Sequence, residues 1–537
     1  MAEVSPNGTY TLSAEVARRR TFAIISHPDA GKTTLTEKLL LYSNAIHLAG
    51  SVRARRNQRN ATSDWMAIER ERGISITSTV LQFPYADHIV NLLDTPGHAD
   101  FSEDTYRTLA AADSAVMVLD AAKGIEAQTR KLFEVCRQRG LPIFTFINKL
   151  DRPARDPLDL LDEIEAVLEM QPAPMNWPIG DGPGFRGVYD RATRTVHLFD
   201  RTAHNQTISP DTMFALDDQQ LAAELSQTRR DELVAGVELL DGLGIEFDHE
   251  LTLAGEQTPV FFGSALTNFG VQLFMNAFLQ YAPPPRGYLS DHGSVEPLRD
   301  GFSGFVFKIQ ANMNPRHRDS VAFMRVCSGR FERNMAVTHA RTGATIRLPR
   351  PYKFFADDRE VVEEAYPGDI IGLPSNGKFS IGDTLCANGN FSFAPIPRFE
   401  PELFARLQNA DIGRQKQFLK GLRQLETEGA MQVLHETDAL QRHPVLAVVG
   451  QLQFDVVRAR LENEYGVETV LEPLPYTLAR IVSGEPDAIG ALPWGYGLLR
   501  TRDSQARDIA LFRSSYDLDH CRENYPDVTF HSFGASL

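Results

Sequence analysis

Four short stretches of this chain carry residue types that together could bind and hydrolyse a nucleoside triphosphate. They are SHPDAGKT at 26–33, RGISI at 72–76, DTPGH at 94–98 and NKLD at 148–151. The first is typical of a phosphate-binding loop, the third of a turn that senses the γ-phosphate, and the fourth of a loop that reads a purine base. Their order along the chain predicts a single nucleotide pocket.

The first stretch has the strand, loop and helix context that phosphate binding requires. An apolar run at 21–25 predicts a buried strand before it, and helix-forming residues follow at 34–41. Gly31 lets the backbone turn its N–H groups inward, Lys32 would lie against the β- and γ-phosphates, and Thr33 offers a hydroxyl to Mg²⁺. The other residues expected at the phosphates are Ser26, which replaces the first glycine of the usual G-x-x-x-x-G-K-[ST] pattern, His27, Pro28, Asp29, Ala30 and Thr34.

The third stretch supplies a metal-binding carboxylate and a candidate catalytic side chain. Asp94 follows the apolar run 88–93 and can hold Mg²⁺ through water. Gly97 gives a backbone N–H that can approach the γ-phosphate without a Cβ in the way. His98 stands where small signalling GTPases use a glutamine to orient the attacking water, so we expect it to act in hydrolysis. The alternative interpretation is an ordinary solvated histidine after a turn.

The fourth stretch specifies guanine. Asn148, Lys149 and Asp151 follow the strand-like run 143–147. The Asp151 carboxylate can accept hydrogen bonds from N1–H and the exocyclic amine of guanine, a donor pair that adenine does not present. The base pocket would be completed by backbone contacts from Ser264, Ala265 and Leu266. The predicted ligands are therefore GTP or GDP together with Mg²⁺.

Length and composition are those of a large protein with several cores. The chain has 537 residues, 42% of them hydrophobic, which favours three domains. Its four cysteines show no paired spacing, so neither a disulfide framework nor a zinc site is predicted. No segment has the apolar length of a membrane span and no signal-peptide core precedes Arg18, so we expect a cytoplasmic protein with no membrane partner.

Charge is distributed unevenly along the chain. The formal net charge of -15 argues against a simple basic nucleic-acid binder. The chain nevertheless contains two local clusters of basic residues. One comprises Arg53, Arg55, Arg56 and Arg59, and the other comprises Arg316, His317, Arg318 and Arg325. Such runs are often solvated surface charge, but the first could also meet RNA phosphate, with an affinity that falls as salt rises.

Linkers and element patterns divide the chain into three predicted domains. The first is an α/β P-loop domain at 1–286, which ends in the proline-rich linker 282–287. The stretch between Asp151 and Ser264 is longer than a minimal GTPase needs, so it implies an insertion at about 160–255 with a hairpin at 187–199 and helix at 217–243.

The remaining two domains follow the same reasoning. Short strands at 304–311, 320–328 and 369–374 with glycine turns predict a small β-barrel at 287–392. After a second linker at 393–397, helices and strands alternate, which predicts an α+β domain at 393–537, built as one unit or as two stacked units. The expected helices there are 414–428, 453–465 and 516–524, and the expected strands are 445–449, 467–471 and 528–530.

The forms RGISI and DTPGH resemble the translational GTPases, and the insertion is similar to that of elongation factor G. The resemblance implies that Ser75, where most members carry threonine, supplies a hydroxyl to Mg²⁺ in the GTP state. It also implies that Pro28 and Ile74 form an apolar gate beside His98, that Asp29 is the acid of the phosphate loop, and that large-subunit ribosomal RNA aligns His98. The barrel would touch the small ribosomal subunit.

Further motifs resemble the bacterial members of this family that act in translation termination. They are the Ser-His-Pro-Asp start of the phosphate loop, Asp64-Trp65-Met66, the stretch KIQANM at 308–313 and a single α+β tail. The chain has no room for the decoding-site domains of elongation factor G, so translocation is not expected. The resemblance implies a monomeric, ribosome-dependent GTPase that contacts both subunits and removes the codon-reading release factor after peptide release.

Two other functions remain open from the sequence. One is another ribosomal GTPase, of the translocase or tetracycline-protection type. The other is a nucleotide-gated binding module that acts away from the ribosome. Ribosome stimulation of GTP hydrolysis, measured with and without a bound release factor, distinguishes these possibilities.

Overall fold

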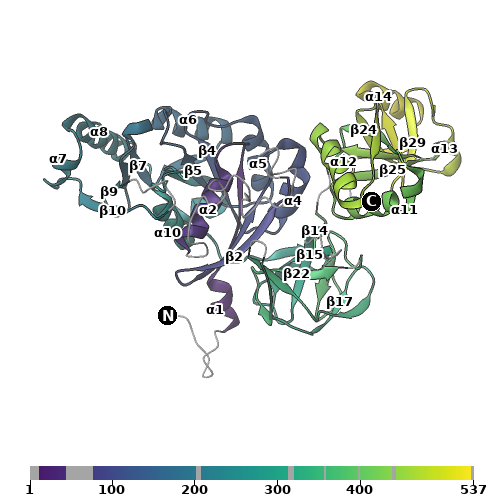
Figure 1. Ribbon diagram of the computed structural model, residues 1–537, viewed down its shortest axis with the longest axis horizontal. Coiled ribbons are helices and arrows are strands. Elements are labelled where there is room, and N and C mark those ends of the chain that lie inside the picture. Colours follow the sequence, from purple (N-terminus) through teal and green to yellow (C-terminus); the bar gives the residue numbers. More distant parts are fainter. Residues whose placement is uncertain are drawn as a thin grey trace.

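The computed structural model describes residues 11–43, 76–200, 207–311, 320–355, 358–375, 377–396, 399–437 and 443–533. The chain forms an α/β body with an outlying lobe, an all-β body beneath it and an α+β body to the side (Figure 1). The predicted multidomain fold class is confirmed.

A seven-stranded sheet forms the centre of the α/β body. Its strands are β1 (Arg19–Ser26), β2 (Thr79–Tyr85), β3 (His88–Asp94), β4 (Ser114–Asp120), β5 (Ile143–Asn148), β6 (Gln171–Pro174) and β11 (Gln257–Phe262). They lie in the order β2-β3-β1-β4-β5-β11-β6, with β2 antiparallel to β3 and the other neighbours parallel. The apolar runs in the sequence become strands buried on both faces, as parallel sheets require.

Helices cover both faces of this sheet. Alternate residues of β1 point to opposite sides, so Phe22 and Ile24 enter one buried cluster while Ala23 and Ile25 enter the other. The helices α2 (Lys32–Tyr42) and α10 (Val271–Tyr281) contribute to the first cluster. The second is covered by α4 (Ser102–Ala110), α5 (Ala127–Gln138) and α6 (Pro157–Leu168), and the short helix α1 (Leu12–Ala17) precedes the sheet.

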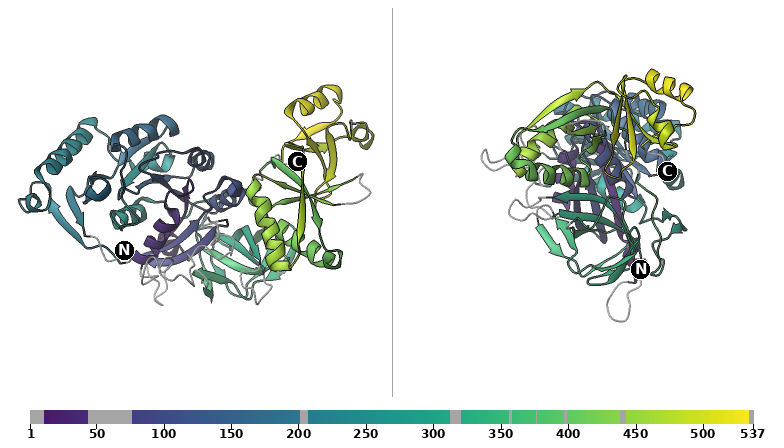
Figure 2. Two further views of the ribbon diagram at one scale, coloured as in Figure 1. Left: turned by 45° about the horizontal axis from the view of Figure 1, so that its top comes forward. Right: turned by 90° about the vertical axis from the view of Figure 1, so that its right-hand side faces the viewer.

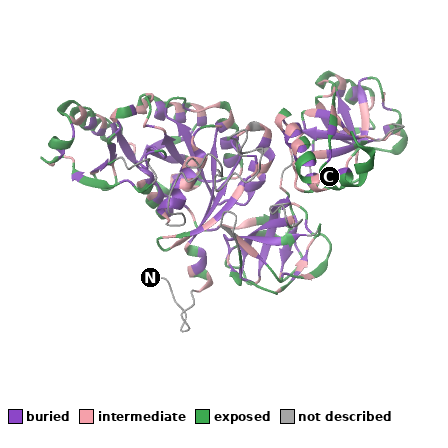
Figure 3. Cartoon of the chain, viewed as in Figure 1, coloured by how far each residue is buried: buried purple, intermediate pink, exposed green. Residues whose placement is uncertain are grey.

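The outlying lobe is inserted between β6 and β11. It contains a four-stranded antiparallel sheet of β7 (Asn176–Ile179), β8 (Gly187–Asp190), β9 (Thr195–Phe199) and β10 (Asp211–Ala215), followed by α7 (Leu221–Glu224), α8 (Gln227–Leu243) and α9 (His249–Ala254). The predicted hairpin is confirmed as β8 and β9. The helix predicted at 217–243 is interrupted at Leu225, which is extended, and Ser226 then caps α8 by accepting from the Arg229 N–H. The lobe helices expose much of their surface (Figure 3).

The all-β body is an open, barrel-like antiparallel sheet around its own core. Its order is β18-β17-β23-β14-β15-β22-β19-β20. The long central strands β14 (Ser303–Ala311) and β15 (Ser320–Ser328) confirm the predicted ones, and β22 (Ile370–Ser375) lies one residue later than expected. The other strands are β12 (Tyr288–Ser290), β13 (Gly293–Val295), β16 (Phe331–Glu332), β17 (Ala336–His339), β18 (Ala344–Arg347), β19 (Tyr352–Phe355), β20 (Asp358–Val361), β21 (Glu364–Ala365) and β23 (Thr384–Cys386).

The α+β body has one eight-stranded sheet in two halves, seen best in Figure 2. One half comprises β27 (Thr469–Leu474), β24 (Leu403–Asn409), β26 (Pro444–Val448) and β25 (Gln432–Glu436), with α11 (Gln415–Thr427) and α12 (Gln451–Tyr465). The other comprises β29 (Leu498–Arg502), β30 (Asp508–Phe512), β28 (Leu478–Ser483) and β31 (Thr529–His531), with α13 (Pro486–Gly490) and α14 (Ser515–Asn524).

The two halves share a buried apolar layer that includes Phe404 and Leu434 from the first and Ile481 and Leu511 from the second. This arrangement agrees with two stacked α+β units. The strand predicted at 467–471 begins later, because Gly466 ends α12 in the left-handed region at φ +66° and Val467 turns into the core.

The barrel is joined to the α/β body by a buried ion pair. The Arg325 guanidinium of β15 donates to Asp113 Oδ2 at 2.6 Å and to the Ala111 carbonyl at 2.9 Å, and both charged side chains are fully buried. Burial works against the charge, but the Asp113 carboxylate raises the pKa of Arg325 above its ordinary value. The prediction that Arg325 belongs to an exposed basic cluster is therefore wrong.

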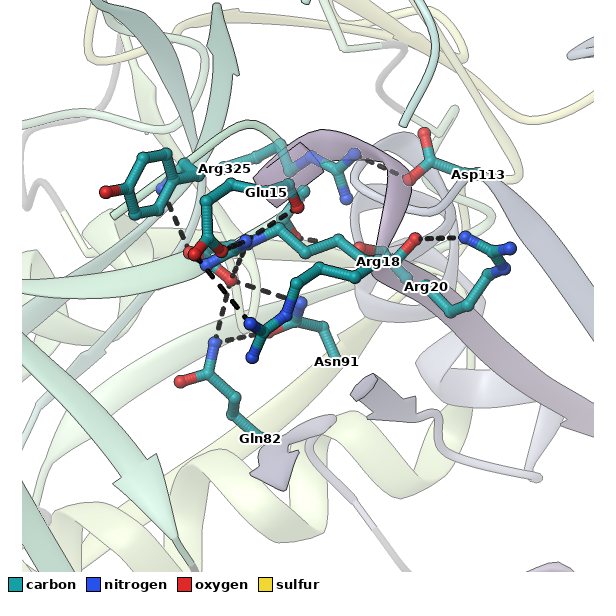
Figure 4. Close-up of polar contacts among 12 residues, drawn as sticks. Glu15, Arg18, Arg20, Gln82, Asn91, Asp113 and Arg325 are labelled. Carbon is teal, nitrogen blue, oxygen red and sulfur yellow. Dashed lines mark hydrogen bonds and ion pairs between the residues drawn. The ribbon is translucent and has the colours of Figure 1, made fainter. Parts of the chain in front are cut away.

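A second polar group and a shared apolar cluster extend this interface. Figure 4 shows Gln82 and Asn91 directed toward the same group of contacts, where both amides donate to Asp369 Oδ1, which also receives Arg19 Nε at 2.9 Å. One buried cluster continues from residues such as Leu109 and Ala111 into Phe305 and Cys327 of the barrel. The two bodies are thus packed as one.

Replacing Arg325 with alanine should destabilise the chain by about 3 kcal/mol, because Asp113 would remain buried without its cation. Urea denaturation measures this change. Arg330→Ala is the matched control, since Arg330 pairs with Glu364 at the exposed surface and its loss should change stability by less than about 1 kcal/mol. Equal stability of both variants would contradict the assigned role of Arg325.

Candidate nucleotide site

The predicted motifs meet at one edge of the central sheet. The phosphate loop follows β1, the DTPGH turn begins at the end of β3, NKLD begins at the end of β5, and Ser264 follows β11. These strands are parallel and close together in the sheet, so their carboxyl ends deliver the four loops to one place.

The phosphate loop has the backbone shape of an anion cradle. Asp29 and Gly31 have φ values of +66° and +95°, and Gly31 is the residue before α2. Left-handed residues at this turn aim successive N–H groups, with the helix start, toward the space above the loop. Ser26 ends β1 and is buried, with its hydroxyl donating to the His27 carbonyl at 2.9 Å.

Lys32 and Asp94 face one another beside this loop. Lys32 Nζ lies 3.8 Å from Asp94 Oδ1, and both side chains are buried. Thr33 and Thr34 lie in the first turn of α2. Lys32, Thr33 and Asp94, which the sequence assigns to one site, therefore lie at the same loop. Their contacts with a nucleotide stay a prediction.

Asn148 ties the phosphate loop to the base-reading loops. Its amide Nδ2 donates to the Ala30 carbonyl at 2.8 Å, and its Oδ1 accepts from the Ala265 N–H at 2.8 Å. A Cβ on Gly31 would collide with the same amide. The phosphate loop can therefore lie this close to Asn148 only if residue 31 is glycine. The motif residues therefore hold each other in place before any ligand contact is considered.

The base-reading residues converge in the same region. Ser264 Oγ donates to Asp151 Oδ1 at 2.6 Å, which orients the carboxylate predicted to read guanine. Lys149 Nζ donates to the Asp29 carbonyl and to Asp120 Oδ2, the latter at 2.9 Å. Leu266 is partly exposed, with 38% of its surface accessible.

The switch residues lie partly outside the described part of the chain. Gly97 approaches the phosphate loop closely, because a Cβ there would be 3.4 Å from Pro28 Cα. The His98 side chain is 38% exposed and its Nδ1 lies 3.3 Å from Asp100 Oδ1. Outside the described residues are Ser75, Ile74, Asp64-Trp65-Met66, and the basic residues Arg53, Arg55, Arg56, Arg59, Arg316, His317 and Arg318.

Two carboxylates at the site were not singled out from the sequence. Asp120 ends β4 at the same sheet edge; burial opposes its charge, but the hydrogen bond from Lys149 lowers its pKa below the ordinary value. Glu126 Oε2 lies 2.8 Å from His27 Nε2. The position of Asp120 after a fully apolar run was a usable signal, whereas Glu126 depends on how α5 packs.

His27 should make stability sensitive to acid. Burial lowers its pKa below the ordinary 6.5, although Glu126 acts in the opposite direction. The His27 imidazole is therefore protonated more readily in the unfolded chain than in the folded one. The stability that neutral His27 contributes is present above the unfolded pKa of about 6.5 and is lost as the pH falls below it. Melting temperatures between about pH 8 and 5.5 should fall less steeply in His27→Gln than in the original chain. The exposed-site control His292→Gln should retain the original slope, and equal slopes in all three would contradict this role.

The donor set fits a hard cation with few protein ligands. Within the described residues, no three or more His, Cys, Asp and Glu side chains gather as a metal-binding group. Mg²⁺ does not require such a group, since it keeps several waters and takes few protein oxygens. The Thr33 hydroxyl and Asp94 carboxylate suit that chemistry beside a bound phosphate chain.

The fold and the site together define a GTPase of the translational class. Residues 17–284 match the family model described as elongation factor Tu GTP binding domain, and residues 301–388 match elongation factor G domain 2. Residues 393–522 match the model described as class II release factor RF3, C-terminal domain.

Full-length relatives narrow this class. A protein named peptide chain release factor 3 from Gloeobacter violaceus is 59% identical over 97% of this chain and 98% of its own length. Another of that name from Microcystis aeruginosa is 58% identical over 97% of this chain and 96% of its own length. The chain belongs to the peptide chain release factor 3 family, so the predicted GTPase activity and role in translation termination are confirmed.

A solved structure supports the fold independently. A crystal structure of a protein from Thermus thermophilus superposes with a TM-score of 0.68 at 22% identity, covering 92% of this chain and 72% of that one. Among the described helices, none combines the length and apolar composition needed to cross a membrane.

Proposed function

We propose that this chain is a ribosome-dependent GTPase that drives the codon-reading release factor off the ribosome after peptide release. In this proposal the GTP-bound chain favours one ribosome conformation over another, and only that difference in affinity does the driving. GTP hydrolysis then releases the chain itself.

The observation that carries the proposal is the position of the segment after DTPGH. Its helix α4 lies where the three bodies meet, since Lys308 of the barrel is 3.8 Å from Asp104 and Arg107 donates to the Gly429 carbonyl of the α+β body at 3.3 Å. If this segment moves when the γ-phosphate is lost, its contacts would shift both the barrel and the α+β body. Nucleotide state would thus control the surface offered to the ribosome.

The proposed nucleotide site assigns each motif a role. Asp151, Asn148, Lys149, Ser264, Ala265 and Leu266 would hold guanine, and the loop 26–34 with Gly97 would hold the phosphates. Thr33, Ser75 and, through water, Asp94 would hold Mg²⁺, whose charge would offset that of the phosphates. His98 would orient the attacking water under the influence of large-subunit RNA.

A basic groove supports contact with ribosomal RNA despite the acidic net charge. It lies between the barrel and α11, has a volume of about 490 Å³, and presents the exposed cations Lys416, Lys420 and Arg423. These residues are three and four positions apart, so they share one helix face. Phosphate contacts there would weaken as salt rises.

We also propose a division of the chain into three domains. The boundaries proposed are 1–286 with an insertion at about 160–255, 287–392 and 393–537. We also propose that the chain acts as a monomer in the cytoplasm, contacting both ribosomal subunits.

The decisive experiment uses post-termination ribosomes carrying a fluorescent codon-reading release factor. Adding the chain with GTP should accelerate release-factor dissociation, and GDP should not. Ribosomes should also stimulate GTP hydrolysis. Stimulated hydrolysis without faster dissociation would favour another ribosomal GTPase, and absence of stimulation would favour a binding module that acts elsewhere.

A further inference from the structure

Asp100 contacts both the candidate catalytic histidine and a helix of another body. Its backbone N and its Oδ1 each lie 3.3 Å from His98 Nδ1, so an unprotonated Nδ1 accepts from the N–H and a protonated one can donate to the carboxylate. Its other carboxylate oxygen, Oδ2, accepts from the Leu452 N–H at 2.6 Å. Leu452 lies in the first turn of α12, so one carboxylate links the imidazole to a helix start 352 residues away in sequence.

The start of α12 is shaped to receive this carboxylate. A Cβ on Gly450 would overlap the Asp100 carboxylate, so the residue before the helix must be glycine for the two to meet. Gln453 Oε1 already accepts from the N–H groups of Val449 and Gly450. Asp100 accepts from the first-turn N–H of Leu452, where the helix dipole favours a negative charge.

Apolar packing holds the same junction closed. Ile76, Phe101 and Val456 form a buried cluster against which Leu452 packs. Phe101 lies beside His98, with ring centroids 6.2 Å apart. Asp100 and Phe101, which follow His98, are therefore anchored to the α+β body.

A second anchor lies one helix further along. Arg107 of α4 donates to the carbonyls of Glu428 and Gly429 at 3.3 Å, directly after α11 ends. An acid therefore meets the start of α12 and a base meets the end of α11, which matches the dipole of each helix. Both contacts fix how the α+β body sits on the segment that carries His98.

We propose that Asp100 is a positioning residue for His98 and that it couples the imidazole to the seating of the α+β body. This inference rests on the proposed role of His98 in hydrolysis. When Nδ1 carries the proton, it can donate to the carboxylate, which fixes the ring and leaves Nε2 to face the reacting water, as in other acid-histidine pairs. When α12 leaves, Asp100 loses the Leu452 N–H and the ring loses its fixed direction. Hydrolysis thus depends on domain seating without any nucleotide contact from the α+β body.

The test compares single-turnover GTP hydrolysis by the full chain at saturating ribosomes and without ribosomes. Asp100→Ala removes the carboxylate, and Gly450→Ala leaves it intact but blocks its approach to α12. Each should lower the hydrolysis rate about tenfold, with nucleotide Kd changed less than about twofold. Gly490→Ala is the matched control, because nothing lies near a Cβ at that helical glycine.

Asp100→Asn adds a rescue measurement, since its amide oxygen can still accept from the Leu452 N–H. Its rate should exceed that of Asp100→Ala, and equal rates would overturn the link through α12. Unchanged rates in Asp100→Ala or Gly450→Ala would overturn the proposal, as would a joint loss of rate and nucleotide affinity. If ribosomes fail to stimulate the original chain, the proposed function fails, while the ribosome-free rates still test Asp100.

Discussion

Replacing His98 with alanine should lower the ribosome-stimulated rate of GTP hydrolysis by about a thousandfold, within the range measured for loss of a positioned acid-base group. Nucleotide affinity should remain, because none of the contacts predicted to hold GTP comes from the His98 side chain. Single-turnover hydrolysis at saturating ribosomes, together with a fluorescent-nucleotide titration, separates the two quantities.

The control for this variant is His520→Ala, which removes an exposed histidine on α14 of the α+β body. It should hydrolyse GTP at the original rate. If His98→Ala also kept that rate, His98 would have no part in the mechanism and its contact with Asp100 would be structural only.

Replacing Asp151 with asparagine should weaken GTP binding by about a thousandfold, or ~4 kcal/mol. The carboxylate is predicted to accept from two guanine donors, and an amide would instead face the exocyclic amine with its own N–H₂ group. Xanthine carries a carbonyl at that position, so affinity for XTP should rise in the same variant. Titrations with fluorescent GTP and XTP measure both changes.

Asp156→Asn is the matched control for Asp151, because Asp156 is a nearby exposed cap of α6 that accepts from the Leu158 N–H at 2.8 Å. It should leave both affinities unchanged. A GTP affinity that survives Asp151→Asn would remove Asp151 from the base pocket and leave the preference for guanine to the backbone after Ser264.

The meeting of the phosphate loop, DTPGH and NKLD at one sheet edge was predictable, because each of these three motifs comes at the end of a buried strand. An apolar run ending in Asp94 or Asn148 indicates both the strand and the edge to which its loop belongs. The bond between Asn148 and Ala265 was not predictable, since 117 residues separate them and only the adjacency of β5 and β11 brings them together.

Arg325 was wrongly placed in an exposed basic cluster because its partner, Asp113, is distant in the sequence. Arg325 follows other basic residues in sequence, which favours a surface cluster, but its strand faces Asp113 across a domain boundary. The sequence contains both charges without indicating that they meet. The contact between Asp100 and Leu452 escaped prediction for the same reason, and the interruption of the predicted helix 217–243 shows that composition alone does not fix where a helix begins.

The apolar cluster that continues from the central sheet into the barrel limits where the chain can be cut into fragments. A fragment ending at 286 would expose the faces that now bury Leu109 and Ala111 against barrel residues such as Phe305. Such a surface promotes aggregation. The α/β body and the barrel are therefore expected to be expressed and engineered as a pair.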